Sequence, residues 1–150
     1  MTVNIDNAGI VPRDDYQAAL KSILAEGHCP FCEDYLHHHH KEPILWKSDH
    51  WIVTKNAWPY AGTQLHFLLI TREHVERVED LSLEAQQSFF AEYARLVEEF
   101  SLSGATILWR SGNTTQTGAS VVHLHAQIIV SHPRTENSTP ITAVVGFDPQ

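Results

Sequence analysis

The chain has 150 residues, with 10 lysines and arginines against 18 aspartates and glutamates, so its formal net charge is -8. This length suits one domain with a sizeable core, and a hydrophobic content of 43% excludes a wholly disordered chain. The acidic balance argues against general coating of nucleic acid, and no segment nears the ~20 apolar residues of a membrane span. Histidines, at 11, outnumber lysines plus arginines and are the compositional feature to explain.

The first part of the chain predicts a loose lead-in followed by a helix. Residues 1–13 are polar and lack the basic head and apolar run of a secretory signal, so the expected location is the cytoplasm. From Asp14 or Asp15 onward, apolar side chains recur at helical spacing, and Gly27 is well placed to end the helix.

Two cysteines follow in the motif Cys29-Pro30-Phe31-Cys32. In a reducing compartment such a motif is more often a metal knuckle or a redox pair than a structural crosslink. The next stretch, 33–43, is polar and includes four consecutive histidines at 37–40. It predicts a solvated loop with adventitious affinity for nickel or copper.

The rest of the chain alternates strands with one long helix. Ser82 can cap a helix that runs to about Phe100. A Gly- and Thr-rich loop is expected at 111–119, and a peripheral tail from His132. The predicted strands cover 44–46, 51–56, 65–71, 105–110 and 120–130. Tight turns between neighbours favour an antiparallel sheet of about five strands, and therefore an α+β fold with two main helices.

The last predicted strand has one polar and one apolar face. Alternation places His123, His125 and Gln127 on the same side, opposite a side that carries only apolar residues. Such a polar row must be bonded to something, because buried unpaired polar groups cost free energy. Cross-strand partners are one solution. The other is a catalytic site for a phosphate compound, since a neutral imidazole is a competent nucleophile toward phosphorus. The preceding Gly118-Ala119-Ser120 offers N–H groups and a hydroxyl to a phosphate.

The segment from Gly118 to Gln127, GASVVHLHAQ, resembles the signature of the histidine triad (HIT) superfamily of nucleotide hydrolases and transferases. The resemblance extends back through Asn56, the run from His66 to His74 and the cysteine pair. It implies a HIT-like domain at 20–132, with a lead-in at 1–19 and a tail at 133–150.

The resemblance also assigns roles to single residues. His125 matches the family's nucleophile, which forms a covalent nucleotidyl-histidine intermediate, and Ser120 matches a residue that contacts the scissile phosphate. Gln127 is expected to orient that phosphate. The expected substrate-binding residues are Asn56 near the ribose, His66 with no firm role, and Asn113, Gly118 and Ala119 of the phosphate-side loop. Asn113 is only adjacent to the loop asparagine of many relatives, whose place Gly112 takes here.

Position 127 departs from the hydrolase branches, which usually have a third histidine there. Gln127 is similar to the transferase branches, galactose-1-phosphate uridylyltransferase and the dinucleoside tetraphosphate phosphorylases, although this chain is short for either. Glutamine cannot supply a titrating proton to a poor leaving group. The residue therefore favours phosphoanhydride substrates, for example a dinucleoside polyphosphate, or phosphate as the acceptor.

The resemblance to the uridylyltransferase pattern completes a metal site. Cys29, Cys32, His74 and His123 match its zinc ligands, and two thiolates with two imidazoles are a set that tetrahedral zinc accepts. On this interpretation zinc braces the fold, His123 is structural, and the chemistry requires no cofactor. Two alternatives stay open: His28 could replace one ligand, or the thiols could be reduced and metal-free.

Three functions follow from these features. The first is an enzyme, a nucleotidyl hydrolase or transferase acting on a nucleoside 5′-phosphate derivative. The others are a nucleotide-binding regulatory module with little turnover, and a metal enzyme in which His123 and His125 hold a catalytic ion. The resemblance further implies a homodimer built through the long helix and a sheet edge. The expected partner is a small nucleotide, and neither a nucleic-acid polymer nor a membrane. Trp58 lies in the loop beside Asn56, where a purine could stack.

Overall fold

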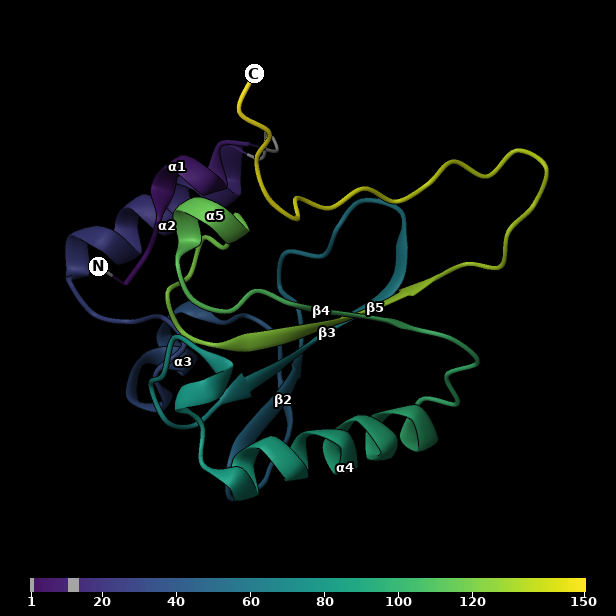
Figure 1. Cartoon of the computed structure of the whole chain (residues 1–150), viewed down its shortest axis with the longest axis horizontal. Coiled ribbons are helices and arrows are strands. Elements are labelled where there is room, and N and C mark those ends of the chain that lie inside the picture. Colours follow the sequence, from purple (N-terminus) through teal and green to yellow (C-terminus); the bar gives the residue numbers. More distant parts are fainter. Residues whose placement is uncertain (1, 11–13) are drawn as a thin grey trace.

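The computed structural model describes residues 2–10 and 14–150. Five strands form one open antiparallel sheet in the order β1-β2-β3-β5-β4 (Figure 1). The strands are β1 (Ile44–Lys47), β2 (Trp51–Lys55), β3 (Thr63–Thr71), β4 (Thr106–Trp109) and β5 (His125–Ser131). The helices are α1 (Ile5–Ala8), α2 (Asp14–Glu26), α3 (Glu33–His39), α4 (Leu83–Glu99) and α5 (Thr114–Thr117), with a 3-10 turn at Val78–Asp80. The predicted α+β fold is confirmed.

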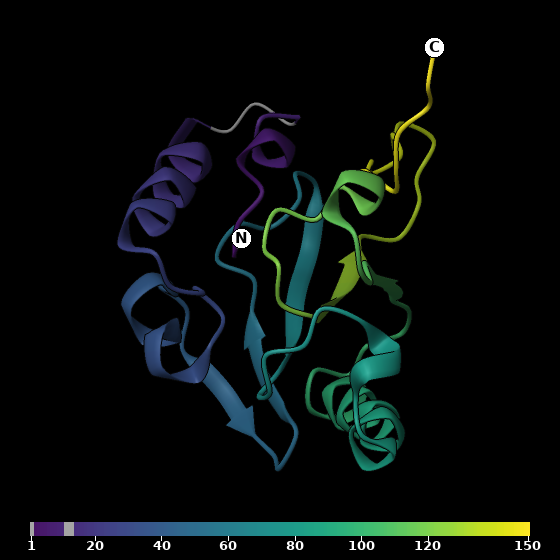
Figure 2. The same ribbon diagram turned by 60° about the vertical axis from the view of Figure 1, so that its left-hand side comes forward.

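Both faces of the sheet are covered, because alternate residues of the central strands are apolar on each side. α4 packs on one face, where Phe89 contacts the cluster that includes Phe67 and Leu69 of β3. α3 packs on the opposite face, where Leu36 joins Ile70 of the same strand. Figure 2 shows α2 and α3 on one side of the sheet and α4 on the other.

The centre of the sheet positions the site, since β3 and β5 pair antiparallel along most of their length. Their register sets Ile70 opposite His125 and Leu68 opposite Gln127. The apolar face predicted for the last strand is confirmed, because Leu124, Ala126, Ile128 and Val130 lie in the core beneath α4. The predicted start at Ser120 is wrong: β5 begins at His125, and residues 120–124 form a loop held by other segments.

Residues 2–7, in the predicted lead-in, are bonded to the loop before β5. Val3 forms an isolated bridge with Val121, and the Val122 N–H donates to the Thr2 carbonyl at 2.9 Å. The Asn7 amide donates to two carbonyls of the 114–119 loop, at 2.7 Å each. These bonds replace the strand pairing that the loop before β5 lacks. Residues 11–13, also predicted as lead-in, lie outside the described part of the chain.

The predicted helix from Asp14 is confirmed as α2, which continues through the expected boundary between residues 19 and 20. Gly27 follows it with φ +76°, a left-handed conformation that favours glycine. The loop expected at 33–43 is wrong in its first part, because residues 33–39 form α3. α5 likewise interrupts the loop expected at 111–119.

The tail after Ser131 has no helix or strand, yet part of it is not peripheral. It leaves the sheet and returns toward α5 in Figure 1, and residues 140–144 line the pocket described below. Within the described residues, no helix combines the length and apolar character that a bilayer crossing requires.

Candidate active site

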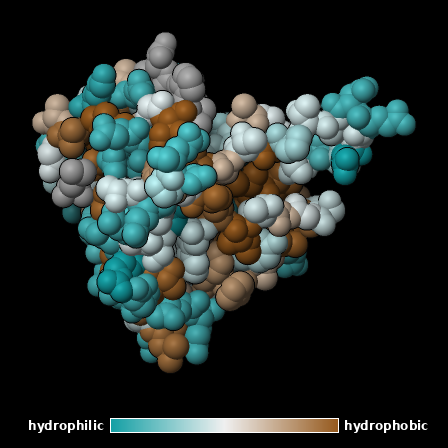
Figure 3. Space-filling view, turned by 45° about the horizontal axis from the view of Figure 1, so that its top comes forward, coloured by the Kyte–Doolittle hydropathy of each residue, from teal (hydrophilic) through white to brown (hydrophobic). Residues whose placement is uncertain are grey.

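A pocket of about 540 Å³ opens beside β5, within the size range of small-molecule sites. α2 supplies Leu20 and Ile23 to its wall, and the loop before β5 supplies residues 118–121. Apolar side chains gather between the N-terminal helices and the projecting tail in Figure 3. The pocket brings together most of the predicted catalytic and substrate-binding residues, namely Asn56, Gly118, Ala119, Ser120, His125 and Gln127.

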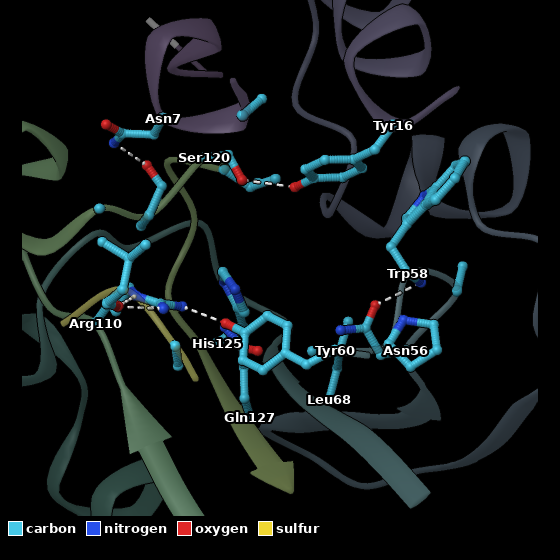
Figure 4. Close-up of a pocket in the computed structure, with 18 of the residues that line it drawn as sticks. Asn7, Tyr16, Asn56, Trp58, Tyr60, Leu68, Arg110, Ser120, His125 and Gln127 are labelled. Carbon is cyan, nitrogen blue, oxygen red and sulfur yellow. Dashed lines mark hydrogen bonds between the residues drawn. The ribbon is translucent and has the colours of Figure 1, made fainter. Parts of the chain in front are cut away.

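His125 lies in this pocket among the side chains that line it (Figure 4). Its two ring nitrogens have different surroundings. Nδ1 lies 2.7 Å from the His123 carbonyl, which can only accept, so Nδ1 carries the proton of the neutral ring. Nε2 is then the nitrogen with the lone pair. The pKa of His125 is lowered to about 4, mainly by burial; the bond to the His123 carbonyl raises it and the positive charge of Arg110 lowers it. His125 is therefore neutral at pH 7, the state that a nucleophile requires.

The bonds of His66 fix the orientation of Gln127. The Tyr60 N–H donates to His66 Nδ1 at 3.1 Å, which leaves His66 Nε2 as the protonated nitrogen. That nitrogen donates to Gln127 Oε1 at 2.9 Å. Because the amide oxygen faces His66, the amide nitrogen of Gln127 is the end left to donate elsewhere in the pocket. His66 is 4% exposed, and its bond to Gln127 sets the direction of that amide.

Asn56 holds the loop that follows β2. Its Oδ1 accepts from the Trp58 N–H at 2.9 Å, and its side-chain nitrogen lies 3.3 Å from His66 Nε2. Trp58 also lines the pocket, with its ring tilted against that of Tyr16 at a centroid separation of 5.4 Å. An aromatic wall next to Asn56 can stack a base.

The loop before β5 forms the opposite wall. Ser120 Oγ is bonded to the Tyr16 hydroxyl at 2.6 Å, and its carbonyl accepts from the Asn4 N–H at 2.8 Å. Ala119 is buried, and its carbonyl accepts from Asn7. Gly118 has φ +74°, and a Cβ there would lie 2.6 Å from Cγ1 of Val144 in the tail. Only glycine permits this close approach.

Asn113 is the predicted substrate residue that the structure places elsewhere. It is exposed, is not part of the pocket lining, and caps α5, where its Oδ1 accepts from the Thr115 N–H at 3.0 Å. An asparagine at a helix N-cap has a sufficient structural reason to be there. The structure does not bring Asn113 to the pocket, because its side chain turns into its own helix.

Arg110 is a pocket residue outside the set predicted from the sequence. It follows β4, and among the described lining residues it alone carries a permanent positive charge. Its guanidinium donates to the Tyr60 hydroxyl at 3.0 Å and to the Val144 carbonyl at 3.1 Å. A guanidinium is suited to phosphate oxygens. The available signal was an arginine at the end of a strand next to a glycine-rich loop.

Cys29, Cys32, His74 and His123 converge on one point, as the resemblance implied. His123 Nδ1 lies 3.4 Å from the Cys29 sulfur and 3.8 Å from the Cys32 sulfur, and His74 Nδ1 lies 3.3 Å from the Cys32 sulfur. In a tetrahedral zinc site with sulfur and nitrogen ligands, these separations are about 3.4–3.8 Å. The four residues therefore fit a zinc ion in both donor type and spacing. His28 is not among them.

The surroundings of this cluster also suit a metal. His123 is 2% exposed, and its Nε2 donates to the Thr71 carbonyl at 2.7 Å, which points the lone pair of Nδ1 at the thiols. Burial raises the pKa of Cys29 to about 11, so without a cation this thiol stays protonated; a bound metal would deprotonate it. Because His123 faces the sulfurs and His125 faces the pocket, the two do not share a catalytic ion in this geometry.

Comparisons with known proteins agree with this geometry. The model of the HIT domain matches residues 38–134. A HIT family hydrolase from Clostridium thermocellum is 19% identical, with a TM-score of 0.55 over 77% of this chain and 98% of that one. A zinc-bound histidine triad family protein from Mycobacterium smegmatis is 15% identical, with a TM-score of 0.54 over 77% of this chain and 81% of that one.

A histidine triad protein from Clostridium difficile is 15% identical, with a TM-score of 0.52 over 86% of this chain and all of that one. A search of curated proteins found no match. These structural similarities establish the fold, and the matched domain spans more than half of the sequence. The chain belongs to the HIT domain family.

Proposed function

We propose that this protein is a nucleotidyl hydrolase or transferase that acts on a nucleoside 5′-phosphate derivative through a covalent intermediate on His125. The observation that carries the proposal is the state of His125: a neutral ring in the pocket, with Nδ1–H bonded to the His123 carbonyl. Membership of the HIT family and the similarity to a HIT family hydrolase support this class of reaction.

In the first step, Nε2 of His125 attacks the α-phosphorus of the bound nucleotide. A P–N bond forms, the P–O bond to the leaving group breaks, and the leaving group departs with the electron pair. The ring becomes positively charged, and the Nδ1–H bond to the His123 carbonyl stabilises that charge. In the second step, water or another acceptor such as phosphate attacks phosphorus, the P–N bond breaks, and the lone pair returns to Nε2.

The surrounding residues hold the phosphate during both steps. Arg110 supplies positive charge, and the Gln127 amide supplies a donor whose direction is set by His66. Ser120 supplies a hydroxyl from the opposite wall. Since the Gln127 amide does not titrate, it gives no proton to the leaving group, and we expect phosphoanhydrides to be better substrates than phosphoramidates or esters.

We propose that Cys29, Cys32, His74 and His123 hold Zn²⁺ as a structural ion. When bound, it would fix the segment after α2 to the end of β3 and the loop before β5, and so set the position of His123. His123 in turn presents its carbonyl to His125. The similarity to a zinc-bound histidine triad protein and the spacing of the donors support this assignment.

Trapping the intermediate tests the function. The protein would be mixed with a dinucleoside polyphosphate labelled at the α-phosphorus, denatured in alkali and digested. We expect acid-sensitive label on the peptide that contains His125, and none in His125→Ala. His50→Ala, a change outside the pocket, is the control and should label normally. Labelling that persists in His125→Ala, or nucleotide binding without any label or turnover, would overturn the proposal; the second result would instead identify a regulatory binding module.

A further inference from the structure

We infer a second metal site, formed by Glu26, His28 and His39, that takes a divalent transition-metal ion such as Zn²⁺. This site is separate from the cysteine cluster, and the four-histidine run contributes only one of its members. Glu26 ends α2, His28 lies two residues later, and His39 ends α3, so the site joins the ends of two helices.

The three ligand atoms form a nearly equilateral triangle. Nε2 of His28 lies 3.2 Å from Nε2 of His39, and Oε2 of Glu26 lies 3.1 Å from the first nitrogen and 3.3 Å from the second. Ligands about 2.0–2.1 Å from a tetrahedral ion are about 3.3–3.4 Å apart. The triangle therefore matches one face of a zinc tetrahedron, with the fourth position left for water.

Hydrogen bonds among these three atoms account for their close spacing less well than a bound ion does. An N–H that points at one corner of such a triangle lies about 60° away from the next corner, so one proton cannot serve two partners. If both histidines donate to the carboxylate, their two protons lie next to each other. An ion inside the triangle accepts all three lone pairs at once, and two imidazoles with one carboxylate are a common set for divalent transition metals.

A neighbouring aromatic ring fixes the orientation of His28. His28 stacks on Tyr35, with centroids 3.9 Å apart and planes 15° apart. The side chains of His28 and His39 are 23% and 13% exposed, so the site is partly enclosed but reachable from solvent. The next histidine in the run, His40, is bonded to Thr54 at 2.7 Å instead. Geometry thus selects His39 from the four.

Occupation of this site would stiffen the wall of the pocket. α2 contributes Leu20 and Ile23 to that wall, and His39 itself borders it. His28 and Cys29 are consecutive, so the short segment between α2 and α3 would be anchored on one side by the cysteine cluster and on the other by this second ion.

Metal stoichiometry tests the inference independently of any enzymatic activity. The full chain would be freed of metal under reducing conditions, dialysed against low micromolar Zn²⁺ and analysed. We expect two equivalents per chain in the native protein, one in His39→Ala and two in His38→Ala, where an exposed neighbour in the same run is changed. One equivalent in the native protein, or equal loss in His38→Ala and His39→Ala, would overturn the inference.

Cobalt separates the two sites by their ligands. In a Co²⁺ titration, the thiolate site gives sulfur-to-metal charge-transfer absorption, whereas a site of two histidines and one glutamate gives only weak d–d bands. Cys29→Ser should lose the strong charge-transfer absorption and keep the weak bands, and Glu26→Gln should do the reverse. Glu26 is 43% exposed, so the conservative change leaves packing intact. Weak bands that persist at full intensity in Glu26→Gln would contradict the site.

Discussion

Burial and the positive charge of Arg110 both lower the pKa of His125 and so keep its ring neutral. The reaction should therefore slow only at low pH, where the ring becomes protonated. With a pKa of about 4, the ring is unprotonated throughout neutral pH and gains a proton on Nε2 only as the pH falls toward that value. The single-turnover rate of label transfer should therefore be flat from about pH 8 to about pH 5.5 and decrease below about pH 5. Rapid quench measurements would check this, and a break near pH 6.5 would contradict it.

Replacing Arg110 tests the effect of its charge on the pKa of His125. Arg110→Gln removes a charge that lowers the pKa of His125, so the acid limb of the same profile should move to higher pH. The loss of a charge-assisted bond to phosphate should also reduce kcat/KM by about 10–100-fold. Arg134→Gln, an exposed charge in the tail, is the matched control. An unchanged profile and unchanged kcat/KM would remove Arg110 from the site.

Among the structural elements, the loop before β5 and the tail meet at Gly118. Gly118→Ala forces an L side chain into φ +74° and against Val144, whereas Gly27→Ala meets the same strain at φ +76° with no atom within 4 Å. The positive φ should lower the free energy of unfolding of both variants by about 1–2 kcal/mol, and the contact with Val144 should lower that of Gly118→Ala further. Only Gly118→Ala should also weaken nucleotide binding, because it displaces the tail. Denaturant unfolding and calorimetric binding would measure the two effects, and equal binding by both variants would contradict this role of the tail.

The elements that the sequence predicted best are those with strong periodicity. Alternation and apolar content were sufficient for β3, and the Ser82 cap with its apolar stripe was sufficient for α4. α3 was missed because its histidines resemble a polar loop, and only Leu36 faces the sheet. The predicted start of β5 is too early. Residues 120–124 alternate as a strand does, but their backbone groups bond mainly to the segments around Val3 and Val75 instead of to a neighbouring strand of the sheet.

The site residues also differ in how far the sequence predicts them. Residues within the signature, such as His125 and Ser120, lie together in the pocket because their spacing along one short segment nearly fixes their positions. Arg110 and the tail at 140–144 come from distant parts of the chain, and nothing local indicates that they meet. Asn113 lies close in sequence to the pocket residues 118–121, but its side chain caps α5 instead of entering the pocket.

At the scale of the whole molecule, we propose a homodimer, for which one side offers a suitable surface. β4 is an edge strand, and its Ile107 is 39% exposed; on the adjacent α4, Leu83 and Phe90 are 63% and 66% exposed. Exposed large apolar groups near a free strand edge favour association with a second copy. Phe90→Glu should therefore convert a dimer into a monomer in light scattering. Val145→Glu, at a 78% exposed position in the tail, should not. A monomeric native protein would contradict the proposal.

The tryptophans give the molecule two separate optical reporters. Trp51 and Trp109 lie together in the core, with ring centroids 6.0 Å apart, and Trp46 is buried nearby, whereas Trp58 borders the pocket beside Tyr16. A change of intrinsic fluorescence on adding nucleotide should therefore originate at Trp58, and the change on denaturation mainly at the others. In Trp58→Phe, the fluorescence change on unfolding should remain, while the change on nucleotide binding should disappear. Intrinsic fluorescence of the native protein can therefore report binding and unfolding through different tryptophans.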